Sequence, residues 1–120
     1  MKEIERVALI TGGGTGIGAA AALKFAAEGS AVALIGRRKQ PLEDIAGKIC
    51  ANGGNAITIS ADLADPRTPK IIVETVIKEW GRLDVLVNDA AAIKHLPLEN
   101  ATLELFNAHM NVNVRAPYFL

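Results

Sequence analysis

The 120-residue chain has a single cysteine, no excess of either charge and no long uninterrupted apolar segment. One cysteine, Cys50, excludes an internal disulfide, and we expect its side chain to lie in the core. Thirteen basic residues balance thirteen acidic ones, so no overall field favours nucleic acid or an anionic membrane as a partner. The longest apolar stretch is mostly alanine, is interrupted by Lys24 and is well short of a membrane span. The first residues mix both charges, unlike a signal peptide, so the expected location is the cytoplasm.

Apolar residues make up half of the chain, which is enough for one domain, residues 1–120, with a substantial core. Four short apolar runs alternate with four segments of helical periodicity. Because the runs are continuously apolar, they are typical of a parallel sheet that helices cover on both faces. The predicted strands are Val7–Ile10, Ala31–Ile35, Ala56–Ser60 and Leu83–Val87, and the predicted helices lie near 17–28, 41–52, 67–80 and 102–116.

This alternation predicts an α/β protein with a doubly wound parallel sheet, the first four βα units of a Rossmann fold in three α/β/α layers. Right-handed crossovers give the strand order 3-2-1-4, with the fourth strand left as an apolar edge. The ligand crevice is therefore expected beyond Ile10 and Val87. Glycines after successive helices act as C-caps, and Asp65-Pro66 is predicted to cap and begin the third helix.

The most informative segment is the glycine-rich turn between the first predicted strand and the helix after it. Its spacing is Gly-x-x-x-Gly-x-Gly; it is not a P-loop, because Ala19 and Ala20 stand where Lys and Ser or Thr are needed. Glycines let the backbone approach a ligand, and the N–H groups of the new helix favour an anion. We expect the pyrophosphate of a dinucleotide; the alternative is a mobile loop without a ligand. The expected cofactor-binding residues of this turn are Thr11, Gly12, Gly14, Thr15, Gly16, Ile17 and Gly18.

Thr11, Gly12, Gly16 and Gly18 resemble the Thr-Gly-x-x-x-Gly-x-Gly cofactor motif of the short-chain dehydrogenase/reductase family. The resemblance runs the length of the chain and covers about the first half of a typical family member. It implies hydride transfer between a nicotinamide cofactor and an alcohol/carbonyl substrate, such as a 3-oxoacyl compound. The partners that it implies are a small-molecule substrate and, since family members often assemble as dimers or tetramers, further copies of the chain.

The residues after the second strand, Gly36-Arg37-Arg38, bear on the choice of cofactor. In this fold an acidic residue there commonly accepts hydrogen bonds from the ribose hydroxyls of NAD. Its absence removes repulsion of a 2′-phosphate, and a guanidinium supplies charged hydrogen bonds to one. We therefore predict NADP(H), with NAD(H) as the alternative cofactor. The alternative interpretation is that Arg37 and Arg38 are solvated residues at a helix start.

Two further strand ends match the family in the right order. Asp62 can hydrogen-bond an adenine amino group or cap the following turn. The family's Asp-Leu pair, matched by Asp62-Leu63, favours adenine contact. Residues 88–91 resemble the family's Asn-Asn-Ala-Gly segment, which braces the sheet beneath the cofactor, and they match it at Asn88 and Ala90. The acidic residue and the second alanine of this segment depart from the pattern.

The last predicted helix places Phe106, Met110, Asn113 and Pro117 on one face. Asn113 is thus expected in an apolar stripe, where its amide needs partners. Pro117 has no N–H to bond the Asn113 carbonyl, which leaves that oxygen for a water or ligand. In the resembling family the Asn of this helix belongs to a tetrad with Ser, Tyr and Lys, which implies a catalytic Asn113. Local rules leave the alternative of an Asn that ends a helix before a proline break.

The other three members of that tetrad have no match. Reduction of a carbonyl needs an acid, for which the family uses Tyr-x-x-x-Lys beside a Ser. Tyr118 is the only tyrosine, and its i+4 position lies beyond the last residue. We expect the 120 residues alone to be inactive; the alternatives are a non-catalytic dinucleotide-binding module or an interaction fragment. His95 and His109 have no carboxylate or cysteine at ligand spacing, so no metal site is expected.

Overall fold

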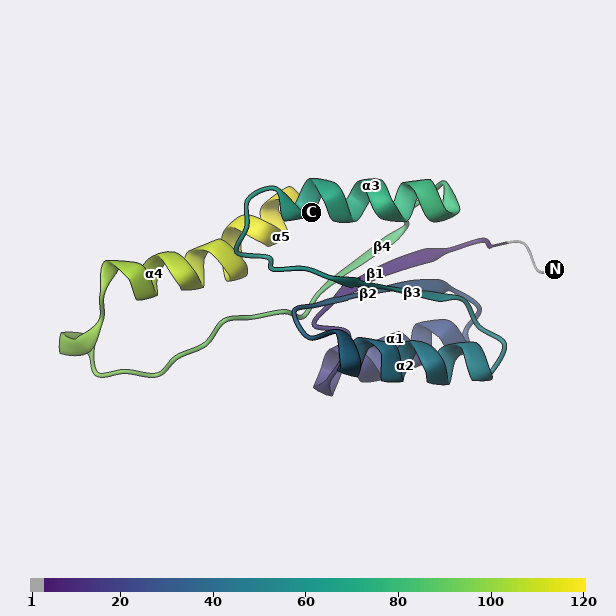
Figure 1. The fold of residues 1–120 in the computed structure, drawn as a ribbon, viewed down its shortest axis with the longest axis horizontal. Helices are drawn as coiled ribbons and strands as arrows, with labels where there is room; N and C mark the ends of the chain where they lie inside the picture. The colour runs from purple at the N-terminus through teal and green to yellow at the C-terminus, as the bar shows by residue number, and fades with distance from the viewer. Residues whose placement is uncertain (1–3) are drawn as a thin grey trace.

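The computed structural model, which describes residues 4–120, is built around a four-stranded parallel sheet. Its first seven elements are β1 (Val7–Thr11), α1 (Gly16–Ala27), β2 (Ala31–Gly36), α2 (Lys39–Ala51), β3 (Ala56–Ser60), α3 (Thr68–Trp80) and β4 (Val85–Asn88). The strand order is β3-β2-β1-β4. Helices α1 and α2 cover one face of the sheet and α3 covers the other (Figure 1). The predicted three-layer Rossmann arrangement and its strand order are confirmed.

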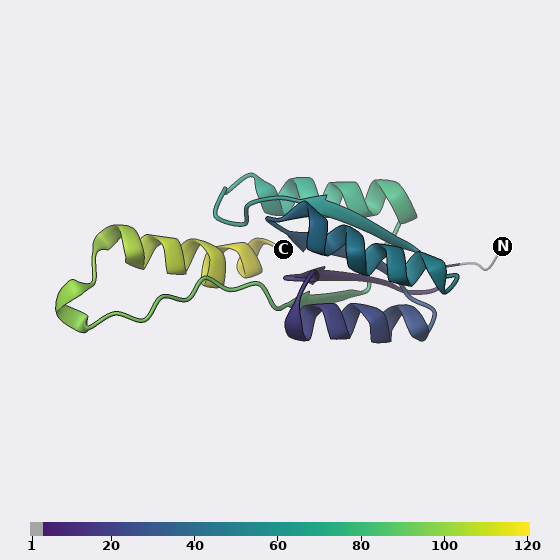
Figure 2. The ribbon, with the colours of Figure 1, turned by 60° about the horizontal axis from the view of Figure 1, so that its bottom comes forward.

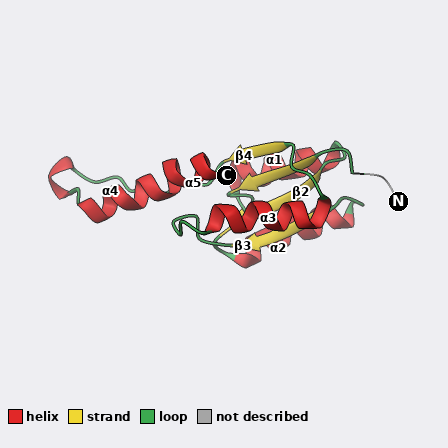
Figure 3. Cartoon of the chain, turned by 90° about the horizontal axis from the view of Figure 1, so that it is seen from above, coloured by secondary structure: helices red, strands yellow, loops and turns green. Residues whose placement is uncertain are grey.

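The two central strands carry the most buried part of the sheet. All five residues of β1 and the first five of β2 are buried, whereas β3 and β4 at the two edges are only partly buried. Within the described residues β4 pairs with β1 alone, so the predicted apolar edge is confirmed (Figure 3). Thr11 lies opposite Ile35 and Asn88, and Gly36 lies opposite Ser60. The carboxyl ends of all four strands therefore meet at one edge.

Each face of the sheet has its own apolar cluster. Ile72 of α3 is fully buried on one face, and α2 buries Leu42, Ile45 and Ile49 on the other. The prediction that Cys50 lies in the core is wrong, because its side chain is exposed. Successive helical residues point about 100° apart, so the residue after a buried Ile49 turns away from the sheet.

The start of α3 differs from the prediction. The helix begins at Thr68 with Pro69 in its first turn, so Asp65-Pro66 does not cap it. The Asp65 carboxylate instead accepts hydrogen bonds from the Arg67 N–H (2.9 Å) and from the Arg67 guanidinium (2.8 and 3.1 Å), which closes a turn before the helix. These bonds lower the pKa of Asp65 to about 2. The glycines after the first three helices have φ of 93°, 82° and 75°, as expected for C-caps.

Asp84 fastens the opposite end of the sheet, where β4 begins. Its carboxylate accepts hydrogen bonds from the Arg82 guanidinium at both oxygens (2.8 Å each) and from the Val7 N–H (2.8 Å). The Asp84 N–H in turn donates to the Val7 carbonyl (3.0 Å). The hydrogen bond from Arg82, followed by that from Val7, holds the pKa of Asp84 below its ordinary value of 3.8.

We expect this carboxylate to make stability depend on acid pH. Because the pKa is depressed in the folded state, the contribution is fully present above the ordinary pKa and is lost as the pH falls through the folded pKa. The thermal midpoint of the chain should therefore fall on acidification from about pH 5 to about pH 2, and part of that fall should be absent in Asp84→Asn. If the thermal midpoint falls equally steeply with falling pH in the native chain and in Asp84→Asn, this role for Asp84 is contradicted.

After β4 the chain forms an arm that leaves the sheet and returns. It runs through an extended loop to η1 (Leu98–Asn100), then along α4 (Leu103–Met110), a π turn (Asn111–Arg115) and α5 (Ala116–Phe119). Figures 1 and 2 show α4 projecting beyond the sheet, with the outgoing loop beside it. The helix predicted for 102–116 is thus one helical path to residue 119, and no break precedes Pro117. In the π turn the Ala116 N–H donates to the Asn111 carbonyl, five residues earlier.

The prediction that the apolar stripe of this arm is buried is wrong. Phe106 is 59% exposed, Met110 is 39% exposed, and Asn113 is exposed as well. The spacing of these residues is helical, as predicted, but α4 lies past the edge of the sheet, where no other described layer packs on that side. Helical periodicity marks a common face without marking what covers it.

Candidate functional site

The carboxyl edge of the sheet opens into a cleft of about 720 Å³. The turn after β1 and the loops after β2, β3 and β4 form its walls, and Ala108 and Val112 of the arm close one side. The size is typical of small-molecule and cofactor sites, and doubly wound sheets bind ligands at this edge. Eight of the predicted cofactor-binding residues line the cleft: Gly12, Gly14, Thr15, Arg37, Arg38, Asp62, Leu63 and Ala90.

The remaining predicted site residues lie beneath or beside this cleft. Gly16 and Ile17 at the start of α1 are exposed, with Ile17 77% exposed, and their N–H groups have no hydrogen-bond partner among residues 4–120. Such donors remain open to an anion. The predicted site residues that do not line the cleft are Thr11 and Gly18, which are buried, and Gly16, Ile17, Asn88 and Asn113, which are exposed.

The glycine turn has a backbone that other residues do not fit. Gly12 and Gly16 have φ of 67° and 54°, in the left-handed region that favours glycine. A Cβ built on Gly18 would lie 2.1 Å from the Gly12 carbonyl oxygen, so the turn and the first turn of α1 are in direct contact. All three motif glycines are therefore required by the conformation itself.

The Thr11 hydroxyl holds the loop that follows β4. It accepts hydrogen bonds from the N–H groups of Asp89 and Ala90 (3.1 Å each) and donates to the Val87 carbonyl (3.4 Å). Thr11 is only 1% exposed. The hydroxyl thus positions one wall of the cleft from below. The motif identified Thr11 as a site residue, but its partners lie more than 70 residues away and no local pattern names them.

Asp89 is a site residue that sequence reasoning did not include. Its Oδ2 accepts a hydrogen bond from the Gly18 N–H (3.0 Å) at the start of α1. The positive end of the helix dipole favours a carboxylate there. The departure from the family's amide at this position is therefore accommodated, and the same carboxylate lines the cleft. An acidic residue directly after a strand that ends beside a helix N-terminus was the available signal.

Arg37 and Arg38 stand at the mouth of the cleft, directly after β2. Both are exposed, and neither guanidinium has a hydrogen-bond or ion-pair partner within residues 4–120. The Ser60 hydroxyl donates to the Arg37 carbonyl (2.9 Å), which ties this backbone to the end of β3. Two unpaired cations are thus held on a fixed backbone at one end of the cleft.

Asp62 makes the turn contact that was one of its two predicted roles. Its Oδ1 accepts from the Ala64 N–H (2.9 Å), and its carbonyl accepts from the Thr68 hydroxyl (2.7 Å). The side chain is exposed at the cleft wall, so turn formation leaves the second oxygen accessible. Leu63 is 7% exposed and belongs to the core cluster on the α3 face.

Asn113 and His109 connect the arm helix to the outgoing loop. The Asn113 amide makes paired bonds with the Ala92 backbone, accepting from its N–H (2.7 Å) and donating to its carbonyl (2.8 Å). His109 Nε2 accepts from the Lys94 N–H (3.0 Å), while Nδ1 lies 2.8 Å from the Leu105 carbonyl. The partners that the Asn113 amide requires are therefore backbone groups. The two side chains lie one helical turn apart and contact alternate residues of the loop.

Within residues 4–120 no group of three or more His, Cys, Asp or Glu side chains is arranged to hold a metal ion. In the same part of the chain, every helix is too short or too polar to cross a lipid bilayer.

A family profile described as short chain dehydrogenase matches residues 6–120. The chain belongs to the short-chain dehydrogenase family. Hydroxynaphthalene reductase arp2 of Aspergillus fumigatus is 40% identical over 116 residues, which cover 96% of this chain and 42% of the relative. The resemblance drawn from the glycine motif is confirmed. Further relatives include versicolorin reductase 1 of Aspergillus parasiticus and an oxidoreductase of Thermotoga maritima, which are 37% and 36% identical to this chain.

Solved structures give the same result. A blue fluorescent protein from a metagenomic library, in complex with NADPH, has a TM-score of 0.92 and 38% identity, covering 97% of this chain and 48% of that chain. A 3-ketoacyl-(acyl-carrier-protein) reductase from Brucella melitensis, complexed with NADH, has a TM-score of 0.86 and 35% identity, covering 97% and 47%. This short-chain dehydrogenase chain therefore spans about half the length of the relatives reported above.

Proposed function

We propose that the chain is the dinucleotide-binding part of an NADP(H)-dependent oxidoreductase that exchanges a hydride with an alcohol/carbonyl substrate. The observation that carries this proposal is the pair of unpaired cations, Arg37 and Arg38, at one end of the cleft whose centre is the glycine turn. A 3-oxoacyl or similar keto compound is the proposed substrate class. A cytoplasmic location is a further proposal, and a homodimer or homotetramer is proposed by analogy with the family.

The residues present fit the cofactor along the length of the cleft. The N–H groups of Gly16 and Ile17 at the start of α1 suit a pyrophosphate, and a Cβ position on Gly16 has nothing within 4 Å, which leaves room for it. Asp62 at the next wall suits the adenine amino group. When bound, the nicotinamide supplies or accepts the hydride. The proposed catalytic Asn113 lies on the arm that closes one side of the cleft. The other members of the family's tetrad, Ser and Tyr-x-x-x-Lys, have no match within these 120 residues.

The absence of a carboxylate at the end of β2 favours NADP(H) over NAD(H). Gly36 has the Leu42 side chain 3.2 Å from the position of a Cβ, so even a small side chain there displaces Leu42. Arg37 follows at once and supplies a charged donor for a 2′-phosphate. Relatives with NADPH and with NADH are both known, so the preference depends on these residues.

Arg37→Ala is expected to weaken NADPH binding about tenfold to a hundredfold and to leave NADH binding nearly unchanged, because only NADPH carries the 2′-phosphate. Titration of the chain with each reduced cofactor, followed by the cofactor's own fluorescence, measures both constants. Lys39→Met is the matched control, since it removes one positive charge from the same segment but from a residue that pairs with Glu43 outside the cleft. If NADH binds the native chain as tightly as NADPH, the assignment to Arg37 is wrong.

A further inference from the structure

The π turn 111–115 holds both walls of the cleft through side chains. Asn113 is paired with the Ala92 backbone in the loop after β4. Two residues later, the Arg115 guanidinium donates from Nη2 to the Ala64 carbonyl in the loop after β3. The donor and acceptor lie 51 residues apart in the chain. One short helical segment therefore bridges the adenine side of the proposed site and the side on which Asn113 lies.

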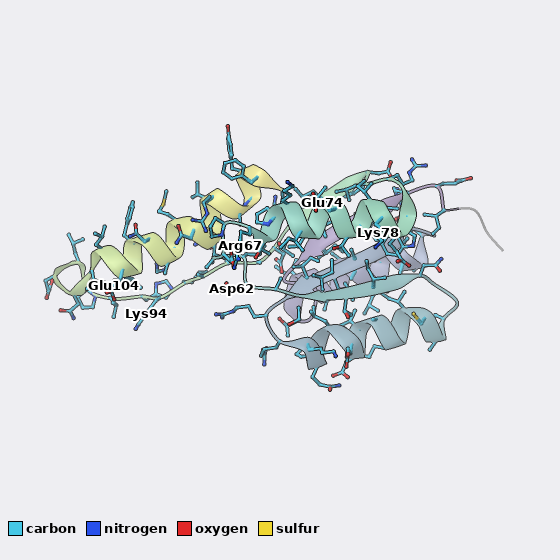
Figure 4. The ribbon with its side chains drawn as sticks, turned by 45° about the horizontal axis from the view of Figure 1, so that its top comes forward. Asp62, Arg67, Glu74, Lys78, Lys94 and Glu104 are labelled. Atoms are coloured by element: carbon cyan, nitrogen blue, oxygen red, sulfur yellow. The ribbon has the colours of Figure 1, made fainter. Side chains whose placement is uncertain are left out.

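The loop at the Arg115 end is well ordered by its own contacts. Ala64 donates its N–H to the Asp62 carboxylate, and Leu63 is buried in the cluster that also contains Ala116, with Val112 packed against it. Figure 4 shows Asp62 and Arg67 where the arm meets the sheet. One charged hydrogen bond and apolar packing therefore connect this loop to the π turn.

The Arg115 side chain donates its hydrogen bond to the Ala64 carbonyl, and its charge, after the hydrogen bonds from Arg67, also helps to lower the pKa of Asp65. Arg115 is not among the residues that line the cleft. The nearby Asp65 is occupied by the Arg67 guanidinium, which hydrogen-bonds both of its oxygens. The Arg115 guanidinium contacts the loop through its hydrogen bond to the Ala64 carbonyl, and a hydrogen bond from a charged donor is among the stronger ones in proteins.

We infer that Arg115 is a positioning residue, which holds the π turn against the loop after β3 and so keeps Asn113 paired with Ala92. Binding at the adenine end of the cleft is thereby coupled to the placement of Asn113 at the other end. The coupling rests on the proposed function, whereas the positioning of Asn113 does not.

Hydrogen exchange at the Ala92 amide tests the positioning, because this N–H donates to Asn113. In the chain without ligand, followed by amide NMR, Arg115→Met should speed exchange at Ala92 about tenfold, the factor expected for loss of one charged hydrogen bond. Arg115→Lys keeps a charged donor and should lie between the two. Lys70→Met is the matched control: it removes one positive charge near the start of α3, but from an exposed residue that pairs with Glu74, and should leave exchange at Ala92 unchanged. Equal exchange in the native chain and Arg115→Met overturns the proposal.

A cofactor fragment tests the coupling with a readout that general destabilisation does not produce. Adenosine 2′,5′-bisphosphate carries the adenine end alone, and it should slow exchange at Ala92 in the native chain and in Lys70→Met but not in Arg115→Met. The same slowing in Arg115→Met overturns the coupling. Failure of the fragment and of NADPH to bind the native chain overturns the proposed function, while the ligand-free comparison still decides the positioning. If Arg115→Met does not fold, Arg115→Lys decides: exchange at Ala92 faster than in the native chain but slower than in the unfolded chain supports the hydrogen bond, and exchange equal to the native rate contradicts it.

Discussion

Gly18→Ala is expected to destabilise the chain by about 3 kcal/mol and to remove dinucleotide binding, because the added methyl group has no space. A Cβ at this position lies 2.1 Å from the Gly12 carbonyl oxygen and 2.8 Å from Asp89 Oδ2. Both neighbours are fixed: the first is backbone of a left-handed turn, and the second is bonded to the Gly18 N–H itself. Relief of the contact must move the turn away from α1 and so open the proposed pyrophosphate site. Urea unfolding and a titration with NADPH measure the two effects.

Gly47→Ala is the control for the same chemical change. Gly47 lies inside α2 and is exposed to solvent, and a Cβ there would meet nothing within 4 Å. Alanine in an exposed helix interior should stabilise the chain by about 0.5–1 kcal/mol and leave NADPH binding as it was. The two variants are thus expected to differ in sign. A Gly18→Ala protein that unfolds and binds like the native chain would show that turn and helix are not packed as described.

The sheet could be predicted from the sequence because its strands are defined by local composition. Central strands in a parallel sheet are buried on both faces, so continuous apolar runs mark them, and glycines mark the helix ends. The strand Ala56–Ser60 has the predicted bounds, and the other three differ by at most two residues at either end. The fold follows because right-handed crossovers leave few orders for four such units.

The contacts that shape the site could not be predicted in the same way. Asp89 reaches Gly18 across 71 residues, and Asn113 reaches Ala92 across 21. Spacing along the chain says nothing of such pairs, which depend on how separate elements meet. Eight of the predicted cofactor-binding residues line the cleft, while the hydrogen-bond partners that hold its walls came only from the structure.

The errors in the sequence interpretation have a common cause. Cys50 was assigned to the core and Asn113 to a buried stripe from hydrophobicity and helical period alone. Period gives the angle of a residue around its helix but not the position of the helix relative to the sheet. For α2 the error is a single position; for α4 no other described layer covers the predicted face.

Thr11→Val is expected to lower stability by roughly 2–4 kcal/mol while keeping the shape of the side chain. The Thr11 hydroxyl is the acceptor for the N–H groups of both Asp89 and Ala90. Valine fills the same space but accepts nothing, and the site is too buried for water to replace the hydroxyl, since Thr11 is 1% exposed. Asp89 and Ala90 also line the cleft, so the loss should weaken NADPH binding about tenfold as the wall shifts.

Thr11→Ser separates the two parts of the threonine side chain. Serine keeps the hydroxyl and loses only a buried methyl group, which should cost about 1 kcal/mol and preserve binding. Amide exchange at Asp89 and Ala90 should be faster in the valine variant and close to native in the serine variant. A direct contact between the hydroxyl and the cofactor predicts a different result, in which Thr11→Val loses affinity with unchanged stability and unchanged exchange. Unfolding curves recorded beside the titration therefore decide whether Thr11 acts on the ligand or on the loop beneath it.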